Sequence, residues 1–587
     1  MKIKFLLILI GVFSIESISF SQQQDLPNRM TSEEEVIMPN YLLNSSQRAT
    51  QGITTPPNSP TRTIGEWEEV QGLVIGWTSF PSMLREIVRH AKEECRVYIL
   101  AGNPQQVWND LNANGIDTVN VTVLDEEFNT VWSRDYGPWS VYTDEVDTLL
   151  TIDWVYNRPR PDDDLVPEVI ANVLNTPLYQ TTSTEYRLVH CGGNFMTDGF
   201  GTGFSSNLVL DENQNHTEAE IDNIMNAFMG IDRYIKMPTL PYDGIHHIDM
   251  HMKLLNEETI LMGEYPQGIA DGPQIEANLL YVINNFNSVY GTPYKVVRIP
   301  MPKDTDHDAY PNAWNGEYWT YTNSTIVNKT VLVPTYNIPE DDIALDIYRD
   351  AMPGYNIIGI NSKASIPSLG AIHCITKEVA AENPLLISHQ ELADTDDNIN
   401  PYPVEAYIKH RSGIATTTLY YRTDETAPYD AVSMTPISGQ NGFYIGYIPP
   451  QYNGTTVQYY IHAEAVSGKE QVRPMPAPDG YFHFDVFGDD PNTSNINNEE
   501  NHNLMIGNIF PNPASAITCI PLNSEKGQHV SIRLFDVTGK LIQTVFEGEL
   551  YAGQNYKFFD ASLLSSGTYM VEISGEFGTK VQKVMAK

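Results

Sequence analysis

The secondary-structure pattern changes twice along the chain, and these changes limit what it can fold into. Between about residues 62 and 390, short apolar segments typical of strands alternate with amphipathic segments typical of helices. Residues 396–487 contain only alternating segments separated by turn residues, which predicts a small immunoglobulin-like sandwich. Residues 506–587 hold further short strand patterns. The chain is therefore expected to fold as an α/β domain followed by two small β-domains.

The remaining segments are expected to lie outside folded domains. Residues 1–21 combine two lysines with the apolar run FLLILIGVF, which is typical of a signal peptide and too short for a membrane span. Residues 22–61 are rich in Ser, Thr, Gln and Pro and predict a leader or linker. The polar residues 488–505 predict a second linker. No later stretch is apolar enough to span a membrane, so we expect an exported protein.

The charge balance limits the partners. With 35 basic and 74 acidic residues, the formal net charge is −39. Nucleic acids and anionic membrane surfaces require basic patches, so both are disfavoured as partners. The acidity is suited to cationic substrates such as guanidinium compounds, although it is equally explained as a means of keeping a secreted protein soluble.

The four cysteines are widely and irregularly spaced, unlike a disulfide framework. Cys95, Cys191 and Cys519 are therefore expected to be free, buried thiols. Cys374, which ends the segment LGAIHC, is a candidate nucleophile.

The segment IHHIDMH at 245–251 supplies the groups that a thiol nucleophile needs. Its apolar context predicts a strand, and residues two apart on a strand face the same side, which would place His247 beside Asp249. A cysteine, a histidine and carboxylates from distant segments indicate covalent thiol chemistry. Taken singly, Cys374 and His247 are each also explained as buried structural residues.

Two further segments place polar residues beside glycines. VWSRDYGPW puts Asp135 just before a turn, where it could serve only as a cap. HCGGNFMTDGFGTG at 190–203 is rich in glycine, but it lacks the P-loop lysine and the dinucleotide spacing, which argues against phosphate binding.

A metal site is the alternative for the histidines. His247, Asp249 and His251 would alternate on one strand face, with His190 and His246 near in sequence. Their spacing matches no standard zinc signature, so we expect neither a metal nor another cofactor.

The motifs occur together in an order that resembles the agmatine deiminase and bacterial peptidylarginine deiminase family of guanidine-modifying enzymes. The resemblance covers about residues 62–390. It implies a pseudo-fivefold α/β propeller of ββαβ repeats with the active site in its central channel. The motifs that carry it are EWEEVQGLVIGW, WSRDYGPW, the GGN loop, HHID and IHCITK.

The resemblance also implies roles for individual residues. It makes Cys374 the nucleophile, His247 the general acid and base, and Asp135 and Asp249 the carboxylates that hold the guanidinium. In peptidylarginine members an asparagine in a YTNS segment joins the site, and here that residue is Asn323. From the same motifs, substrate contacts are expected from Trp132, Gly193 and Asn194.

The run WVYNRPRPDDD bears on the choice of substrate. Its Arg158 and Arg160 resemble the run with which peptidylarginine members bind the C-terminal carboxylate of a substrate, and guanidinium forks suit a carboxylate. The alternative is internal pairing with Asp162, Asp163 or Asp164. One departure is Gly244, which stands where peptidylarginine members carry a tyrosine, with Tyr242 nearby.

The end of the chain resembles the C-terminal sorting domain of proteins exported by the type IX secretion system. The resemblance rests on NPAS, FDVTGKLI, SSGTYMV and the final basic residues. It implies handling by that secretion machinery, removal of the domain, and release or attachment at the cell surface.

These observations predict a secreted, metal-independent hydrolase of linear amidines. The expected reaction converts a peptide's C-terminal arginine to citrulline with release of ammonia. Agmatine, which would yield N-carbamoylputrescine, and free arginine are alternative substrates within the family. From another class of function, a catalytically silent surface-binding protein remains an alternative.

Overall fold

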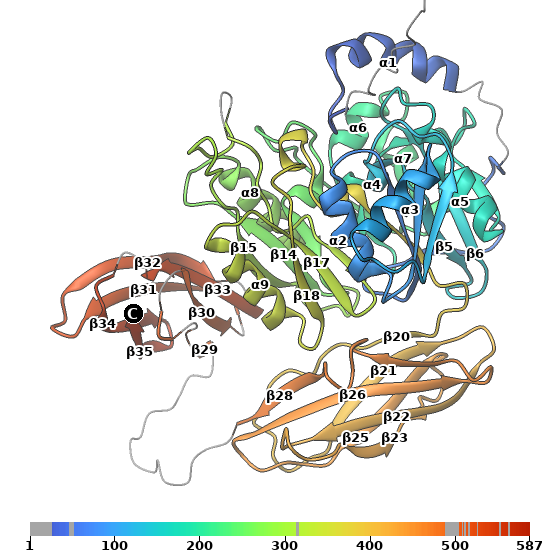
Figure 1. Cartoon of the computed structure of the whole chain (residues 1–587). Helices are drawn as coiled ribbons and strands as arrows, with labels where there is room; N and C mark the ends of the chain where they lie inside the picture. The colour runs from blue at the N-terminus through green and yellow to red at the C-terminus, as the bar shows by residue number, and fades with distance from the viewer. Residues whose placement is uncertain are drawn as a thin grey trace, which may run out of the picture.

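The computed structural model describes residues 26–45, 52–312 and 316–487, and residues 504–586 with short gaps. In chain order it contains an α/β domain, a middle β-domain and a C-terminal β-domain (Figure 1). The expected signal peptide and most of the expected second linker lie outside these residues. None of the described helices is long and apolar enough to cross a membrane.

Five small sheets form most of the α/β domain, and all share one plan. In each sheet one strand pairs antiparallel with a first neighbour and parallel with a second. A helical segment connects the two parallel strands in the chain. The alternation of strand and helix expected over this region is thereby confirmed. Sheet by sheet the strands are β1 (Thr61–Thr63), β5 (Trp139–Thr143), β6 (Leu149–Asp153) and β8 (Leu178–Gln180); β10 (Met196–Thr197), β11 (Thr202–Ser206) and β12 (Arg233–Met237); β13 (Met252–Leu254), β14 (Thr259–Glu264) and β15 (Lys295–Pro300); β16 (Thr325–Val327), β17 (Thr330–Thr335) and β18 (Asn356–Asn361); and β19 (Lys377–Ala380), β2 (Val70–Gly76), β3 (Arg96–Ala101) and β4 (Val121–Asp125), with β7 (Val155–Tyr156) paired to β9 (Val189–His190).

The helices follow local sequence rules. In α7, Thr217 and Glu220 form a capping box at the start, and Gly230 closes the helix with a φ of 68°. Its apolar residues recur at helical spacing and are buried, which stabilises the helix by roughly 1.5–3 kcal/mol for each large side chain. The helices of this domain are α2 (Pro81–Ala91), α3 (Pro104–Ala113), α4 (Ser133–Tyr136), α5 (Val166–Leu174), α6 (Leu208–Glu212), α7 (Glu218–Met229), α8 (Gly272–Asn285) and α9 (Glu340–Ala351).

The middle β-domain consists of two sheets that share one apolar core. One sheet has the order β20-β21-β25-β24 and the other β23-β22-β26-β27, with β28 also paired to β26. In β21 every second residue is buried, as the alternating sequence predicts. The strands are β20 (Leu386–Ser388), β21 (Tyr402–Lys409), β22 (Ile414–Arg422), β23 (Asp430–Ser433), β24 (Thr435–Pro436), β25 (Phe443–Ile448), β26 (Thr455–Ala465), β27 (Glu470–Arg473) and β28 (Phe482–Val486).

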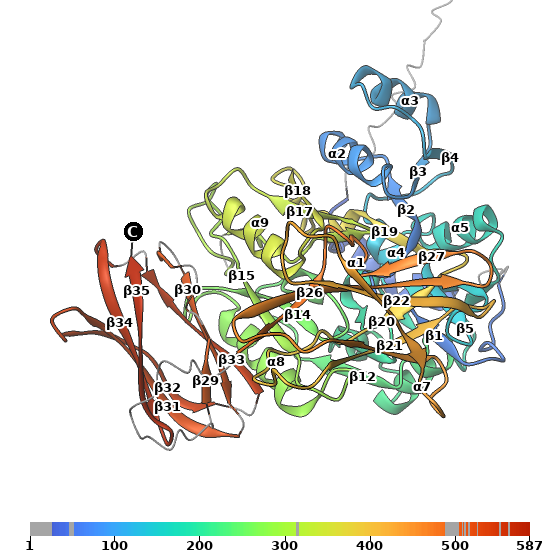
Figure 2. The ribbon, with the colours of Figure 1, turned by 90° about the horizontal axis from the view of Figure 1, so that it is seen from below.

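The C-terminal β-domain has its own core and two sheets, ordered β29-β30-β33 and β32-β31-β34-β35. Figure 2 shows it beside the part of the α/β domain that carries α8. Its strands are β29 (Leu504–Ile506), β30 (Ile517–Ser524), β31 (Gln528–Asp536), β32 (Leu541–Leu550), β33 (Gly553–Asp560), β34 (Gly567–Gly575) and β35 (Gly578–Ala586).

Two largely apolar segments of the sequence are each divided between two strands in the structure. The segment at 148–156 forms β6 and then β7, and the segment at 325–335 forms the hairpin of β16 and β17. The hairpin turns at Asn328, whose φ of 51° lies in the left-handed region that asparagine tolerates.

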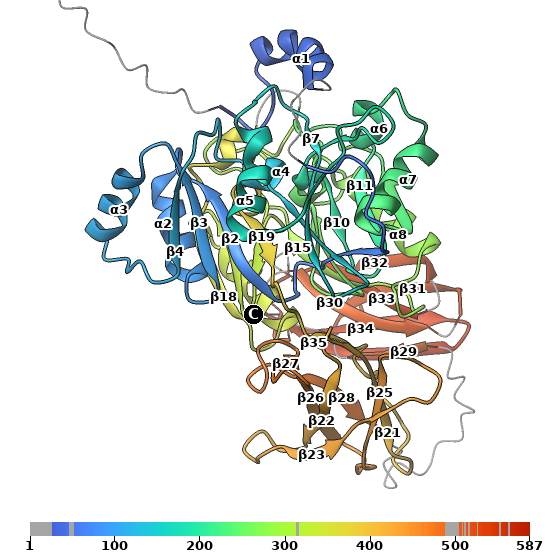
Figure 3. The same cartoon turned by 90° about the vertical axis from the view of Figure 1, so that its right-hand side faces the viewer.

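The expected leader or linker contains a helix. Residues Ser32–Ser45 form α1, and β1 begins at Thr61. Figure 3 shows α1 at one end of the molecule, with the middle β-domain at the other. Its capping box joins Thr31 to Glu34, a local signal that the sequence contains.

Candidate active site

The same place in each of the five sheets supplies the candidate residues. Just before one strand of each antiparallel pair, the chain forms a short turn or bend. Residues of this turn lie close to residues from the matching turns of other sheets. These segments are α4 before β5, η2 (Gly192–Asn194) before β10, η3 (Ile248–Met250) before β13, residues 320–324 before β16, and η5 (His373–Ile375) before β19. We call Asp135, Gly193, His247, Asp249, Asn323 and Cys374 the central cluster.

The expected strand at 245–251 is wrong. His247 is extended, Ile248–Met250 form a single 3₁₀ turn, and β13 begins only at Met252. His247 and Asp249 nevertheless both reach the central cluster, because a turn there leaves them close together.

Cys374 is fully buried and contacts two other members of the cluster. Asn323 Nδ2 lies 3.2 Å from its Sγ, and Asp249 Oδ2 lies 3.6 Å from it. Asn323 Oδ1 also accepts hydrogen bonds from the backbone N–H groups of Ala371 and Cys374, at 3.1 and 3.3 Å. Asn323 therefore fixes the loop that carries the thiol as well as contacting the thiol itself.

Three buried polar atoms of the cluster have no hydrogen-bond partner among the described residues. They are Asp135 Oδ2, Asp249 Oδ1 and His247 Nδ1. The other carboxylate oxygens are engaged: Asp135 Oδ1 accepts from the N–H of Gly193 at 3.1 Å, and Asp249 Oδ2 accepts from His373 at 2.7 Å. Buried polar atoms are almost always paired, so this arrangement is suited to a ligand with several N–H donors.

Gly193 keeps the space between these groups open. A Cβ at this position would lie 2.5 Å from His247 Nδ1, 2.8 Å from Asp135 Oδ1 and 3.3 Å from Asp249 Oδ2. Any side chain here would occupy the point on which the carboxylates and the imidazole converge. The requirement for glycine is thus steric and local to the cluster.

The two carboxylates titrate differently. Burial and the neighbouring charge of Asp249 raise the pKa of Asp135 to about 7. Burial would also raise the pKa of Asp249, but the hydrogen bond and charge of His373 outweigh it and lower that pKa. Close to neutral pH, one carboxylate is therefore firmly ionised and the other is poised to ionise when a cation binds.

Cys374 and His247, the candidate nucleophile and base, are neutral in this structure. Burial lowers the pKa of His247 to about 3. Burial, followed by the charges of Asp249 and Asp135, raises the pKa of Cys374 well above its usual value. A bound cation would oppose both carboxylate charges and favour the thiolate.

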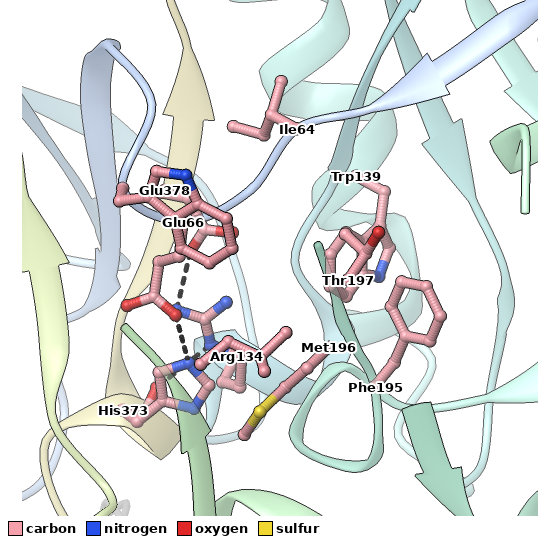
Figure 4. A pocket seen from close by; sticks show the side chains of 11 residues that line it. Ile64, Glu66, Arg134, Trp139, Phe195, Met196, Thr197, His373 and Glu378 are labelled. Carbon is pink, nitrogen blue, oxygen red and sulfur yellow. Dashed lines mark hydrogen bonds and ion pairs between the residues drawn. The ribbon is translucent and has the colours of Figure 1, made fainter. Parts of the chain in front are cut away.

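Several buried charges that support the cluster were missed by the sequence reasoning. His373 Nε2 contacts Glu66 at 3.1 Å, and both Glu66 oxygens accept from Lys253 at 2.8 Å. Arg134 pairs with Glu378 at 2.6 Å. Figure 4 shows Arg134, Glu66 and His373 on one wall of a pocket. Glu66 and His373 stand inside recognised motifs, but only the fold reveals that Asp249 and Glu66 are bridged by one imidazole.

A second thiol also lies at the cluster. Cys191, expected to be an ordinary buried cysteine, has its Sγ 3.2 Å from His247 Nε2. Its position directly before the GGN loop is the one signal that could have identified it.

The expected metal alternative on a strand face does not form. The ring nitrogens of His190 are engaged by Tyr234 and the N–H of Cys191, and those of His251 have no hydrogen-bond partner among the described residues. The described groups near enough to share an ion at this site are instead Asp135, Cys191 and His247. Asp135 and His247 belong to the central cluster, and Cys191 contacts it through His247.

Arg158 and Arg160 are buried and contact residues 26–45 rather than the neighbouring aspartates. Arg158 Nε donates to the carbonyl of Asn28 at 2.9 Å, and Arg160 forms an ion pair with Glu34 at 2.7 Å. The expected alternative of side-chain pairing with Asp162, Asp163 or Asp164 is therefore wrong. Those carboxylates instead accept from Asn129, Thr130, Tyr156 and Tyr41.

The other expected substrate contacts occupy distinct places. Trp132 is fully buried and packs on the loop before Cys374, since a Cβ at Gly370 would lie 2.4 Å from its ring. Asn194 accepts a hydrogen bond from the N–H of Ser206 at 2.9 Å, which anchors the glycine-rich loop. Tyr242 lies two residues before Gly244, the position at which the sequence departs from the peptidylarginine pattern, and it is 43% exposed.

Comparison with known proteins identifies relatives of this arrangement. A putative agmatine deiminase of Vibrio parahaemolyticus is 24% identical over 364 residues, covering 56% of this chain and 99% of that protein. A putative agmatine deiminase of Mycoplasma mycoides is 22% identical, covering 55% and 97%. The solved agmatine deiminase of Enterococcus faecalis has a TM-score of 0.50 at 20% identity, covering 57% and 100%, which shows a shared fold.

Two family models match separate parts of the chain. Residues 508–587 match the secretion system C-terminal sorting domain, which indicates export followed by secretion or attachment to the cell surface. Residues 62–379 match the Porphyromonas-type peptidyl-arginine deiminase model, which spans more than half of the 587 residues. The chain therefore belongs to the Porphyromonas-type peptidyl-arginine deiminase family and ends in a secretion sorting domain.

Proposed function

We propose that this protein is a deiminase that converts arginine at the C-terminus of peptides to citrulline and ammonia, with Cys374 as the nucleophile. The observation that carries the proposal is the set of unpartnered buried atoms on Asp135, Asp249 and His247, beside the Cys374 thiol. A guanidinium is a planar cation with five N–H donors in the arginine side chain, and it matches such acceptors in both charge and geometry.

The reaction follows from these contacts. Asp135 and Asp249 hold the guanidinium, and the proton of Cys374 passes to His247 as the thiolate attacks the central guanidinium carbon. His247 then gives that proton to the departing nitrogen, ammonia leaves, and a thiouronium remains on Cys374. His247 next takes a proton from water, the hydroxide adds to the thiouronium carbon, and the C–S bond breaks to give citrulline and the free thiol.

The finer architecture is part of the same proposal. The five sheets are arranged as ββαβ repeats of a pseudo-fivefold propeller, and the five central segments converge on its axis. The support is that each segment precedes the opening strand of its own sheet. The middle β-domain is an immunoglobulin-like sandwich that packs on the α/β domain, supported by the buried ion pair of Arg473 with Glu257 at 2.6 Å.

The arginine pair supports a peptide substrate with a free C-terminus. The charges of Arg158 and Arg160 act to lower the pKa of Asp135, which supports a position close to the proposed catalytic groups. Arg160 already holds a carboxylate: its Nε and one terminal nitrogen donate to the two oxygens of Glu34 at 2.7 and 3.2 Å. A C-terminal carboxylate offers the same pair of acceptors, whereas agmatine has none.

Agmatine is the second candidate substrate, favoured by the names of the relatives in Vibrio parahaemolyticus and Mycoplasma mycoides. It requires only the guanidinium-binding half of the site. Arg158 and Arg160 would then have a structural role alone.

Formation of the ureido product, citrulline from the peptides or N-carbamoylputrescine from agmatine, tests the proposal. The full chain in EDTA is given a peptide ending in arginine, the same peptide amidated, and agmatine. We expect clear preference for the free-acid peptide, and activity in EDTA removes the metal alternative. Turnover of agmatine alone would overturn the substrate. No product from a chain whose Cys374 reacts with iodoacetamide would overturn the function.

A further inference from the structure

Residues 26–45, which we call the N-terminal strap, lie across the residues proposed to bind substrate. The carbonyl of Leu26 accepts from Trp132 at 3.0 Å, and the N–H of Asn28 donates to the carbonyl of Ser368 at 2.9 Å. Ser368 belongs to the loop that leads to Cys374. Asn28 is itself fully buried, between that loop and Arg158.

The strap supplies acceptors to both arginines, although Arg158 Nη1 donates to the carbonyl of Asn157 and Arg160 Nη1 has no hydrogen-bond partner among the described residues. Besides the bonds to Asn28 and Glu34, one terminal nitrogen of Arg160 donates to the carbonyls of Pro27 and Arg29, at 2.7 and 3.2 Å. The strap thus presents peptide carbonyls and one carboxylate to Arg158 and Arg160. A peptide that ends in a free carboxylate would present the same kinds of acceptor, so strap and substrate compete for the same donors.

The covered centre is closed to substrate. Cys374 and His247 are fully buried, and Asp249 is 1% exposed. The pocket that adjoins the cluster is lined by residues such as Glu66, Arg134 and His373, not by Cys374 or His247. In this form a peptide cannot place its guanidinium on the thiol.

The strap is attached mainly by polar contacts, and Met38 is its one buried apolar side chain among the described residues. None of residues 26–45 belongs to a hydrophobic cluster among the described residues. Its apolar residues Val36, Ile37 and Leu43 are 77%, 50% and 69% exposed. Pro39 lies inside α1, where it removes a backbone hydrogen bond. Loss of the strap would therefore leave the folded body intact.

The far end of α1 is held in the same manner. The hydroxyl of Tyr41 donates to Asp164 at 3.0 Å, and Arg187 donates to the carbonyl of Leu42 at 2.8 Å. Asp164 and Arg187 both belong to the α/β domain and both follow the arginine pair in the chain. The strap is thus tied down at both ends, and its buried ion pair lies between them.

We propose that the N-terminal strap is an inhibitory segment that occupies the peptide-binding half of the active site and must leave before substrate binds. The inference rests on the proposed function, because it identifies the covered donors as substrate-binding groups. Glu34 is the central contact of the strap: it lies in the first turn of α1 and pairs with Arg160, while Glu35 beside it is exposed.

The test uses Glu34→Lys in the full chain, with Glu35→Lys as the matched control. A lysine at 34 faces Arg160 and Arg158 with like charge and should expel the strap, whereas the same change at 35 faces solvent. Two rates are measured: alkylation of Cys374 by iodoacetamide, mapped by mass spectrometry to separate it from Cys191, and citrulline formation from a peptide ending in arginine. We expect both to rise at least tenfold in Glu34→Lys and to stay unchanged in Glu35→Lys.

Adding the strap back as a peptide distinguishes release of the strap from a general loosening of the fold in Glu34→Lys. A synthetic peptide of residues 26–45 should slow both reactions of Glu34→Lys, and the same peptide carrying lysine at 34 should not. Equal alkylation rates in the wild type and both variants would overturn the strap proposal, whatever their turnover. Faster alkylation without turnover of any guanidine would uphold the strap and overturn the deiminase. A Glu34→Lys chain that unfolds at lower temperature and resists the peptide would also count against the strap.

Discussion

The two halves of the proposed active site differ in what occupies them. In the guanidinium half, Asp135, Asp249 and His247 each keep a buried atom without a partner among the described residues. In the carboxylate half, Arg158 and Arg160 are engaged by peptide carbonyls and by Glu34 of the same chain. The first half is preorganised by its own support, and the second is filled by a segment that is not part of the core.

The difference shows how each half is built. Asp249 contacts His373, His373 contacts Glu66, and Glu66 contacts Lys253. All four residues belong to the α/β domain, so the position of Asp249 does not depend on a ligand. The donors of the arginine pair must instead find acceptors, because burying an unpaired guanidinium is costly. Either the strap or a substrate supplies them.

Removal of the proposed nucleophile, in the guanidinium half, should have the largest effect on activity. Cys374→Ala should lower turnover by roughly 10⁴-fold or more, since without the thiol no covalent intermediate forms. Citrulline assays measure the loss, and thermal unfolding checks the fold. Cys95→Ala, at a buried thiol in the core, is the control and should keep its activity. A Cys374→Ala chain that retains a tenth of wild-type activity would exclude the mechanism.

Neutralising Asp249 tests whether two carboxylates are needed. Asp249→Asn should lower kcat/KM about 10²- to 10³-fold, because the guanidinium loses one charged partner in the reacting state. Asp198→Asn is the matched control, since Asp198 is a buried carboxylate whose contacts include the backbone of Phe200 and Thr202. Equal losses in both variants would show that burial of the charge, not its position, matters.

The carboxylate half is tested by a ratio of substrates. Arg158→Ala should lower kcat/KM for a peptide ending in arginine by roughly 10- to 100-fold, from the loss of charged hydrogen bonds. The amidated peptide should change far less. Arg187→Ala, which removes a strap contact outside the pair, should leave the ratio of the two substrates unaltered. An unchanged ratio in Arg158→Ala would assign the arginine pair a structural role alone.

The support of Asp249 predicts an intermediate effect. His373→Leu should lower kcat/KM about tenfold, because one charge-assisted hydrogen bond to Asp249 is lost. That bond lowers the pKa of Asp249, so its loss should move the acid limb of the pH profile to higher pH. His373→Gln, which can still donate an N–H, should recover part of the rate. A loss of rate without a shift of the acid limb would show that His373 acts on something else.

The smallest effect expected is a pH dependence of binding. Burial raises the pKa of Asp135 to about 7, so below that pH the carboxyl is protonated and does not pair with a guanidinium. Affinity of the Cys374→Ala variant for an arginine peptide should rise by less than about twofold above pH 7 and level off near pH 8. It should fall about fivefold between pH 7 and pH 6, approaching tenfold per unit below that range. Calorimetric titration measures it, and Asp135→Asn should remove most of the dependence.

The sequence alone was sufficient for much of the site because its signals are local. The motifs containing Asp135, His247 and Cys374 could be recognised, although the strand predicted around His247 was wrong. Alternation of apolar and polar residues predicted the strands of the β-domains, as in β21. Cys191 and His373 could not be assigned, because their partners His247 and Asp249 lie 56 and 124 residues away in the chain.

What the sequence determined by itself was the order of the motifs that hold the proposed reactive residues, the family that these motifs indicate and the export signal at the end of the chain. These depend on residue type and short-range spacing, which the chain carries whether folded or not. Only the tertiary structure decided which atoms are left unpaired, and that a polar segment expected to be a leader or linker covers the active site. The contact of Glu34 with Arg160 spans 126 residues, and no local pattern encodes a contact whose partners meet only when the domain packs.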